Sequence, residues 1–291
     1  MAHAISSFVQ RRRWVADAVF RLNNCSKDHP VAAMTTSLIM HGAAGRMGQR
    51  ILSLAAEDAA FCVVAGVDRQ PGSLRALGVP SDAPLLAALP VSPGAVVIDF
   101  SHHTAFPAVA AHCAAHGMAL VSGTTGIAPA VLDQTLGGAA AKIAVLHAMN
   151  MSVGVNVVFQ MAAKLAVALG GEYDIEVVEA HHHHKKDAPS GTAFGITDAI
   201  CAATGRTRSD LVHGREGDVG ARRAGEIGVH ALRMGDVVGD HTVYYVGNGE
   251  RIMLGHLAHS RDIFARGALR AAAFMATQPA GRYAMAQVLG L

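Results

Sequence analysis

Aromatic and charged side chains are scarce in this sequence. Of its 291 residues, 5% are aromatic and 16% are charged, and the formal net charge is only +2. A nearly neutral chain with no stripe of alternating basic and aromatic residues lacks the usual features of a nucleic-acid-binding protein or of a membrane-surface protein. We therefore expect neither nucleic acid nor a membrane among its partners.

Cysteine and long apolar runs are also in short supply. The four cysteines are Cys25, Cys62, Cys113 and Cys201, and no two are close enough in sequence to form a C-x-x-C metal or redox pair. No unbroken apolar run reaches the roughly 18 residues that a membrane helix needs. These absences favour a cytoplasmic protein and predict no metal site.

Glycine and small apolar residues are plentiful instead. The chain has 31 glycines and is 51% hydrophobic, which is typical of an α/β enzyme with many glycine turns. Residues 1–33 do not share this pattern. The run Arg11–Arg13 and the amphipathic residues after it indicate either an organelle presequence or an extension upstream of a start at Met34. We expect this extension to be disordered or helical, and the fold to begin after it.

A glycine-rich motif follows the first predicted strand, residues 37–40, and precedes a helical pattern. Glycines in this context allow a tight turn, close approach of the backbone to a pyrophosphate, and packing of the helix. The second strand, residues 62–67, ends at Asp68, which is placed to bond ribose hydroxyls, and Arg69 is placed to pair with a 2′-phosphate. We therefore predict that both NADH and NADPH are used. The cofactor residues predicted in the motif are Gly42, Ala43, Ala44, Gly45, Arg46 and Met47.

Three more apolar strands are predicted at residues 96–100, 119–121 and 143–146. The carboxyl ends of parallel strands meet at one edge of a sheet, where ligands bind. The residues that we expect to line the nicotinamide half of the cofactor there are Gly123, Thr124, Thr125, Ala148, Met149, Asn150 and Met151. For Met149 and Met151, filling of space in the core is an equally simple interpretation.

The second half of the chain has a different pattern. A helix is predicted at residues 153–169, a half-exposed strand at 173–178, and further strands at 226–232, 237–246 and 251–257, with Gly235–Asp236 and Asn248–Gly249 as hairpin turns. A closing helix is predicted at residues 260–274. We predict an α/β fold with two domains. Residues 34–151 plus 258–291 form a Rossmann-type dinucleotide-binding domain. Residues 152–257 form an α+β domain for substrate and oligomerisation, with a mixed or antiparallel sheet covered by helices on one face.

Residues 179–192 concentrate histidine, lysine and carboxylate side chains between a predicted strand and a predicted helix. Four adjacent histidines suggest zinc, but neighbouring residues of an extended loop point in alternate directions and cannot all reach one ion. A solvated polar loop is a second interpretation. Acid–base chemistry combined with anion recognition is the third, and it accounts for the His, the Lys and the Ser-Gly-Thr end together.

The pattern Glu179-Ala-His-His-x-His-Lys-x-Asp-Ala-Pro-Ser-Gly-Thr-Ala193 resembles the signature of the dihydrodipicolinate reductase family of bacterial and plant lysine biosynthesis. Residues 42–48, 123–126, 150–156 and 225–228 also resemble that family, in the same order and at similar spacing. The resemblance covers about residues 37–291. It departs at His183, where many relatives carry another basic residue, and at Met151, where an aromatic is often found beside the nicotinamide.

The resemblance implies an activity and a set of roles. The activity is NAD(P)H-dependent reduction of 4-hydroxy-2,3,4,5-tetrahydrodipicolinate to 2,3,4,5-tetrahydrodipicolinate in the diaminopimelate route to L-lysine. It implies His181 as acid–base catalyst and Lys185 as proton donor. It also implies that His182, Gly191 and Thr192 contact the substrate, that the cofactor residues named above hold NADH or NADPH, and that the second domains assemble a homotetramer.

Two alternatives stay open at this point. One is a related Rossmann-type dehydrogenase acting on another imine or amino acid. The other is a non-catalytic regulator that binds NAD(P)H.

Overall fold

The computed structural model describes residues 35–291, so the predicted extension at residues 1–33 lies outside the described residues. The described chain divides into two compact units. The first contains the residues up to Ala148 together with Ala268–Ala284, and the second contains Met149–Gly267 together with Met285–Leu291. The predicted α/β class with a second sheet is confirmed.

The first unit is built on an eight-stranded sheet with the order β13-β7-β6-β5-β1-β2-β4-β3. All neighbouring strands pair in parallel except β3 and β4. The chain runs outward from β1 on one side and then returns to add β5 on the other, so the topological switch point lies between β1 and β5. Its strands are β1 (Thr36–His41), β2 (Phe61–Val67), β3 (Gly72–Ser73), β4 (Pro84–Leu86), β5 (Val96–Asp99), β6 (Ala119–Ser122), β7 (Ala144–His147) and β13 (Gly281–Tyr283).

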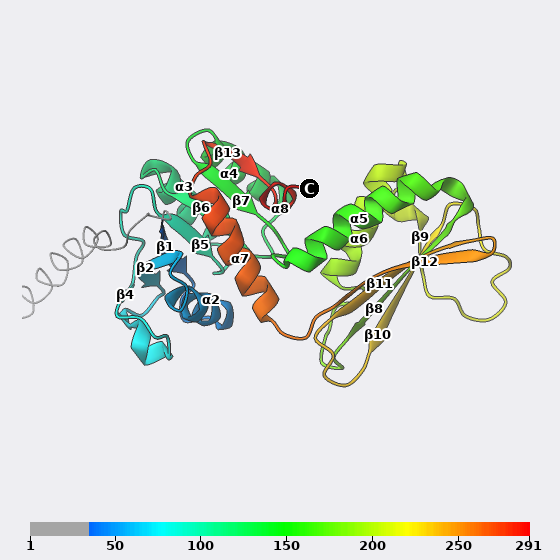
Figure 1. The fold of residues 1–291 in the computed structure, drawn as a ribbon, viewed down its shortest axis with the longest axis horizontal. Coiled ribbons are helices and arrows are strands. Elements are labelled where there is room, and N and C mark those ends of the chain that lie inside the picture. The colour runs from blue at the N-terminus through cyan, green and yellow to red at the C-terminus, as the bar shows by residue number, and fades with distance from the viewer. Residues whose placement is uncertain (1–34) are drawn as a thin grey trace, which may run out of the picture. The chain divides into compact units, whose positions relative to one another are not determined.

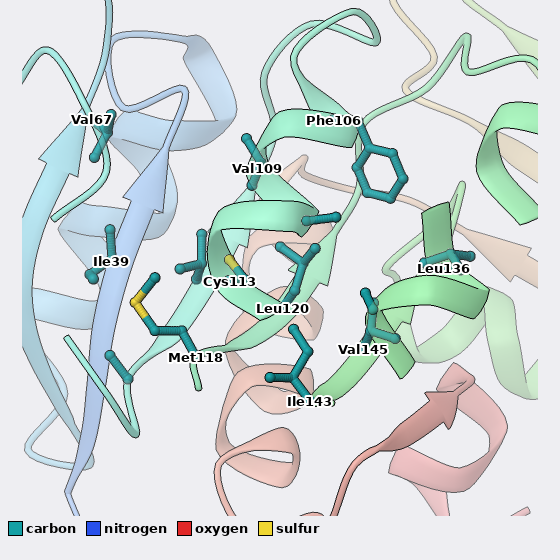
Figure 2. Packing of buried hydrophobic residues seen from close by; sticks show 14 residues of the cluster. Ile39, Val67, Phe106, Val109, Cys113, Met118, Leu120, Leu136, Ile143 and Val145 are labelled. Atoms are coloured by element: carbon teal, nitrogen blue, oxygen red, sulfur yellow. The ribbon is translucent and has the colours of Figure 1, made fainter. Parts of the chain in front are cut away.

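Both faces of this sheet are buried, as the unbroken apolar strands predict. Figure 2 shows Phe106, Val109 and Cys113 of α3 packed with Leu136 of α4 against residues of the central strands. The alternate strand residues Leu38, Met40, Val96, Ile98, Val121 and Leu146 are also fully buried. The helices of this part are α2 (Arg46–Ala56), η1 (Leu74–Leu77), α3 (Phe106–Ala115) and α4 (Pro129–Ala140), and α7 (Asp262–Met275) runs from the second unit into the first.

The second unit has a five-stranded mixed sheet with the order β12-β11-β8-β10-β9. Its central strand, β8, pairs in parallel with β10 and antiparallel with β11. Asn248–Gly249 is a hairpin turn, as predicted, because β11 and β12 are neighbours. The prediction of a hairpin at Gly235–Asp236 is wrong, because β8 lies between the two strands that this turn joins. The strands are β8 (Asp174–His181), β9 (Leu211–His213), β10 (Ile227–Arg233), β11 (Asp240–Gly247) and β12 (Glu250–Leu257).

Helices α5 (Val153–Leu169) and α6 (Gly191–Thr204) cover one face of this sheet (Figure 1). Their apolar residues pack on Ile175, Val177 and Val243, and the hydroxyl of buried Tyr245 donates a 2.7 Å hydrogen bond to the Ala162 carbonyl. The remaining short helices are η2 (Gly170–Glu172), η3 (Arg208–Asp210) and α8 (Met285–Leu289).

Among the described residues, one helix, Val153–Glu172, has the length and apolar composition of a membrane span, with a mean hydropathy of 1.6. It consists of α5 and η2, and α5 packs against α6 and β12 within the second unit. The sequence shows no unbroken apolar run there because Asn156, Gln160 and Lys164 interrupt it.

Gly48 provides a test of how tightly the glycine-rich motif is packed. A Cβ at this position would lie 2.1 Å from the Gly42 carbonyl oxygen, so Gly48→Ala must push α2 away from the turn. We expect a destabilisation of about 1–3 kcal/mol, as for other overpacked sites, and a weaker affinity for NADH, measured by thermal unfolding and by fluorescence titration.

The matched control is Gly137→Ala in α4, where a Cβ would meet nothing within 4 Å. Alanine is favoured over glycine in an exposed helix by about 0.5–1 kcal/mol, so this variant should be at least as stable as the wild type. Equal thermal stability of Gly48→Ala and Gly137→Ala would contradict the tight packing of α2 against the turn.

Candidate functional site

The turn after β1 is shaped to admit an anion. Gly42 has a φ of +84°, and a Cβ there would lie 2.5 Å from the Phe100 carbonyl oxygen. Gly45 begins α2 without a side-chain cap, and no acidic residue stands in the first turn. The first backbone N–H groups of α2 therefore remain available for a pyrophosphate, and the geometry fits the dinucleotide predicted from the motif.

Asp68 lies directly beside this turn. Its Oδ2 accepts a 2.9 Å hydrogen bond from the Ala44 N–H, and its Oδ1 accepts one of 2.8 Å from the Arg69 N–H. The carboxylate therefore helps to fix the turn itself, in addition to the ribose contact predicted for it. Arg69 is exposed at the end of β2.

A buried carboxylate organises the switch point of the first sheet. Asp99 is fully buried, and it accepts hydrogen bonds from His41 Nδ1 at 2.8 Å, Ser101 Oγ at 2.6 Å, Ser122 Oγ at 2.9 Å and Thr124 Oγ1 at 2.8 Å. Burial alone would raise the pKa of Asp99, but the hydrogen bonds from His41, Ser101 and Thr124 outweigh it and hold the pKa below its ordinary value. Hydrogen bonds to this one carboxylate thus hold the carboxyl ends of β1, β5 and β6 together.

The predicted residues after β6 are held by this arrangement. A Cβ on Gly123 would lie 2.4 Å from the Phe100 ring, so glycine is required for that close approach. Thr124 is buried, its hydroxyl is bonded to Asp99, and its carbonyl oxygen accepts a 2.8 Å hydrogen bond from His147 Nε2. Thr125 is exposed at the sheet edge.

The predicted cofactor residues after β7 differ strongly in exposure. The Ala148 N–H is bonded to the Ser122 carbonyl at 3.0 Å, Met149 is 75% exposed, and Met151 is 1% exposed. Asn150 donates a 3.0 Å hydrogen bond from Nδ2 to Thr192 Oγ1. Asn150, a predicted cofactor residue, is therefore hydrogen-bonded to Thr192, a predicted substrate residue, within the second unit.

The histidine segment does not begin as a loop. The alternating pattern predicts a strand that ends at residue 178, whereas β8 continues through Glu179 and Ala180 to His181. The reason is that β8 is the central strand and pairs on both sides, with Ala180 opposite Asp240 and His181 opposite Arg233. His181 is consequently a nearly buried residue at the end of a strand.

Glu179 is fully buried and gathers four hydrogen bonds. Arg233 donates two, Nη1 to Oε2 and Nη2 to Oε1, both 3.0 Å long. The Ser190 N–H donates to Oε1 at 3.0 Å, and His181 Nδ1 lies 2.5 Å from Oε2. Burial would raise the pKa of Glu179, but the hydrogen bonds from Arg233 and His181 outweigh it, and the pKa lies below its ordinary value.

A second histidine, His241 on β11, lies 5.1 Å from His181 between ring centres. It is 3% exposed, and its Nε2 lies 2.9 Å from Ser190 Oγ. Burial, reinforced by repulsion from His181, lowers the pKa of His241 to about 4. His241 is therefore neutral near pH 7, and it does not compete with His181 for a positive charge.

Ser190 also begins α6. Its Oγ accepts a 3.1 Å hydrogen bond from the Ala193 N–H, and Gly191 and Thr192 occupy the first turn. The N–H groups of these two residues lie at the positive end of the helix, which favours an anion. This is the position where the sequence predicts contacts to substrate carboxylates.

The segment between β8 and α6 carries the remaining predicted residues. Lys185 Nζ lies 2.9 Å from Asp187 Oδ2. His182 is half-buried at the wall of a cavity of about 530 Å³, and its pKa is lowered by partial burial and by the nearby Arg261. The cavity is lined by His182, His183, His184, Gly235, Asp236 and Arg261.

Sequence reasoning missed several residues of this site. Arg233, His241 and Arg261 each come from an element distant in sequence, and a single basic residue in a strand or before a helix carries no distinguishing pattern. Glu179 begins the histidine-rich pattern of residues 179–193, but the sequence alone does not indicate what it contacts. In residues 35–291, no group of three or more His, Cys, Asp or Glu side chains is arranged to hold a metal ion.

Comparison with known proteins agrees with these features. Residues 36–151 match the family model described as the N-terminus of dihydrodipicolinate reductase, and residues 154–289 match the model of its C-terminus. The chain is 47% identical over 264 residues to 4-hydroxy-tetrahydrodipicolinate reductase of Myxococcus xanthus, covering 87% of this chain and 97% of the relative. Identity to the enzyme of the same name from Desulfovibrio desulfuricans is 46% over 252 residues, covering 86% and 97%.

Solved structures show the same fold. A dipicolinate-bound dihydrodipicolinate reductase from a Paenisporosarcina species matches with a TM-score of 0.69 at 22% identity, covering 86% of this chain and 98% of that one. A myo-inositol dehydrogenase from Corynebacterium glutamicum matches with a TM-score of 0.53 at 14% identity, covering 85% and 90%. With both family models matched across the two units, this chain belongs to the dihydrodipicolinate reductase family.

Proposed function

We propose that this chain reduces 4-hydroxy-2,3,4,5-tetrahydrodipicolinate to 2,3,4,5-tetrahydrodipicolinate, with NADH or NADPH as the hydride donor, in the diaminopimelate route to L-lysine. The observation that carries the proposal is that β8 ends at His181 beside the N-terminus of α6, with Lys185 in the connecting segment. Acid–base and anion-binding groups thus lie together in a chain whose first unit has a dinucleotide-binding turn. This combination is not expected of a regulator that only binds cofactor.

Recognition of a substrate with two carboxylates needs several separate donors. The first N–H groups of α6, at Gly191 and Thr192, supply one anion site. His182 and Arg261 line the cavity of the same unit, and Lys185, paired with Asp187, adds a cationic group in the segment before α6. A substrate without carboxylates would leave the first N–H groups of α6 without an anionic partner, which favours the dicarboxylate over another imine.

Proton transfer is assigned to the end of β8. The conversion removes the 4-hydroxyl group as water. A nicotinamide, when bound, would supply hydride to the ring carbon at the 4-position, and the electron pair displaced onto the conjugated ring must then be taken up by a proton. His181, or a water that it orders, provides that proton, and Lys185 adds positive charge toward the dianion. His241 stays neutral beside them because of its low pKa.

The cofactor site is proposed at the switch point of the first sheet. Gly42 to Met47 would hold the pyrophosphate, Asp68 and Arg69 would bind the adenosine ribose, and Gly123 to Thr125 with Ala148 to Met151 would hold the nicotinamide. Because Asp68 favours ribose hydroxyls and Arg69 favours a 2′-phosphate, both cofactors are used.

Residues 34–151 plus 258–291 are proposed as the dinucleotide-binding domain, and residues 152–257 as the domain for substrate and oligomerisation. The face of the second sheet opposite α5 and α6 has apolar side chains that are 38–59% exposed. An apolar patch of this kind is typical of protein interfaces, and its occupants are the equivalent faces of other copies in a homotetramer. The exposed residues are Leu232, Val246, Met253 and Leu257. The cytoplasm is the proposed compartment.

The catalytic assignment predicts the effect of two substitutions. His181→Ala and Lys185→Ala should each lower turnover by orders of magnitude while affinity for NADPH survives. Turnover is followed as loss of NAD(P)H absorbance in a mixture of aspartate semialdehyde, pyruvate and a dihydrodipicolinate synthase. Lys186→Ala, at the exposed neighbouring lysine, is the control and should keep normal turnover. Near-normal rates in both site variants would refute the assignment.

The cofactor assignment predicts comparable kcat/KM for NADH and NADPH. Asp68→Asn keeps an oxygen for the Ala44 N–H but loses the negative charge, so it should favour NADPH over NADH. Arg69→Gln should shift the ratio in the opposite direction. A large one-sided preference in the wild-type enzyme, or no change of the ratio in either variant, would contradict the shared use of Asp68 and Arg69.

The oligomer assignment predicts an assembly of four 30.1 kDa chains by sedimentation. Met253→Asp combined with Leu257→Asp places two charges on the exposed sheet face and should dissociate it, because unpaired charges are costly in an interface core. Val167→Asp, on an α5 position that is 58% exposed, is the control. A monomeric wild-type protein would exclude the tetramer.

A further inference from the structure

Glu179 and His181 lie on the same face of β8 because they are two residues apart in a strand. Their side chains meet directly, with Glu179 Oε2 2.5 Å from His181 Nδ1. An ionised carboxylate can only accept hydrogen bonds. The proton of a neutral His181 must therefore reside on Nδ1, which leaves the Nε2 lone pair for the opposite edge of the ring.

Arg233 holds the carboxylate in place from the neighbouring strand. It stands opposite His181 in the register of β8 and β10, and it binds Glu179 through both terminal nitrogens at 3.0 Å. It also donates a 2.6 Å hydrogen bond from Nη2 to the Asp187 carbonyl, in the segment that carries Lys185. A fork of two parallel hydrogen bonds fixes direction as well as charge.

The Nε2 edge of His181 faces a position without a side chain. A Cβ on Gly239, just before β11, would lie 3.0 Å from His181 Nε2. Any larger residue would crowd the nitrogen that exchanges a proton. The titratable groups that face the ring from its neighbours are Glu179 on β8, Arg233 on β10, His241 on β11, and His182 and Lys185 after β8.

We propose that Glu179 and Arg233 are positioning residues for the reduction, with Arg233 keeping Glu179 ionised and Glu179 fixing the Nδ1–H tautomer of His181 so that Nε2 is the atom that exchanges the proton. This inference rests on the proposed function of His181. A purely structural role is the competing explanation, because Glu179 also accepts from the Ser190 N–H at the start of α6. The two explanations differ in what they predict for the imidazole of His181.

The test combines kinetics with ¹⁵N NMR of histidine-labelled protein, in which the His181 signals are identified by their loss in His181→Ala. Glu179→Gln keeps the size of the side chain but not its charge. We expect kcat to fall about 10–100-fold, the loss typical of removing a carboxylate that orients a metal-bound histidine, with KM changed much less. The His181 nitrogen shifts should move from an Nδ1–H pattern toward a mixture of tautomers.

Two comparisons separate positioning from folding. Arg233→Lys keeps the charge and should retain more of kcat than Arg233→Met, and it serves as the second variant if Glu179→Gln does not fold. Glu176→Gln removes a similar carboxylate from β8, one that contacts His230 at 2.7 Å and Arg215 at 3.0 Å, and it should leave the His181 signals unchanged.

A folded Glu179→Gln enzyme with wild-type kcat and an unchanged His181 tautomer would overturn the inference, while loss of turnover in His181→Ala would still support the proposed function. Conversely, a wild-type protein without any turnover would refute the proposed function. The NMR comparison would then decide separately whether Glu179 sets the tautomer.

Discussion

The charge of Glu179 is the constraint on which the arrangement of residues around the end of β8 depends. A buried carboxylate is costly unless hydrogen bonds surround it, and here the donors come from three elements: β8, β10 and the start of α6. Each donor is in turn a part of the site. Satisfying one charge therefore fixes the positions of His181, Arg233 and Ser190 relative to one another, with no need for separate contacts between them.

The first unit also has a buried carboxylate surrounded by hydrogen-bond donors, at the switch point of its sheet. Asp99 gathers donors from the ends of β1, β5 and β6, and Thr124 links this cluster to His147 on β7. Both carboxylates have a lowered pKa, because their hydrogen-bond donors outweigh burial. The stability that they contribute is therefore complete above the ordinary carboxyl pKa and is lost as the pH falls through the lowered values in the folded protein.

Much of the architecture was predictable because it depends on patterns of residues that are close together in the sequence. The glycine motif follows from turn chemistry, the strands of the first sheet from unbroken apolar runs, and α5 from a hydrophobic period of 3.6 residues. The end of β8 was not predictable in this way, since Glu179 and His181 look like loop residues until Arg233, 54 positions away from Glu179, is known to pair with the carboxylate. The prediction of a hairpin at Gly235–Asp236 is wrong for the same reason. Turn residues show that the chain reverses between β10 and β11, but they do not show that β8 lies between these two strands in the sheet. The assigned roles of the site residues came from resemblance and stay predictions.

The central position of β8 has a consequence for how the protein acquires its activity. Residue Ile175 of β8 pairs with Ile227 of β10 and with Tyr245 of β11, so the strand that ends at His181 is completed only by segments synthesised much later. Pairing of such distant segments is slow, because the loop between them must close before any contact forms. A nascent or truncated chain that lacks β10 would have to bury Glu179 without Arg233, which makes early collapse around β8 unfavourable. The arrangement of His181, Glu179 and Arg233 and the cooperative folding of the second unit are thus expected to appear together.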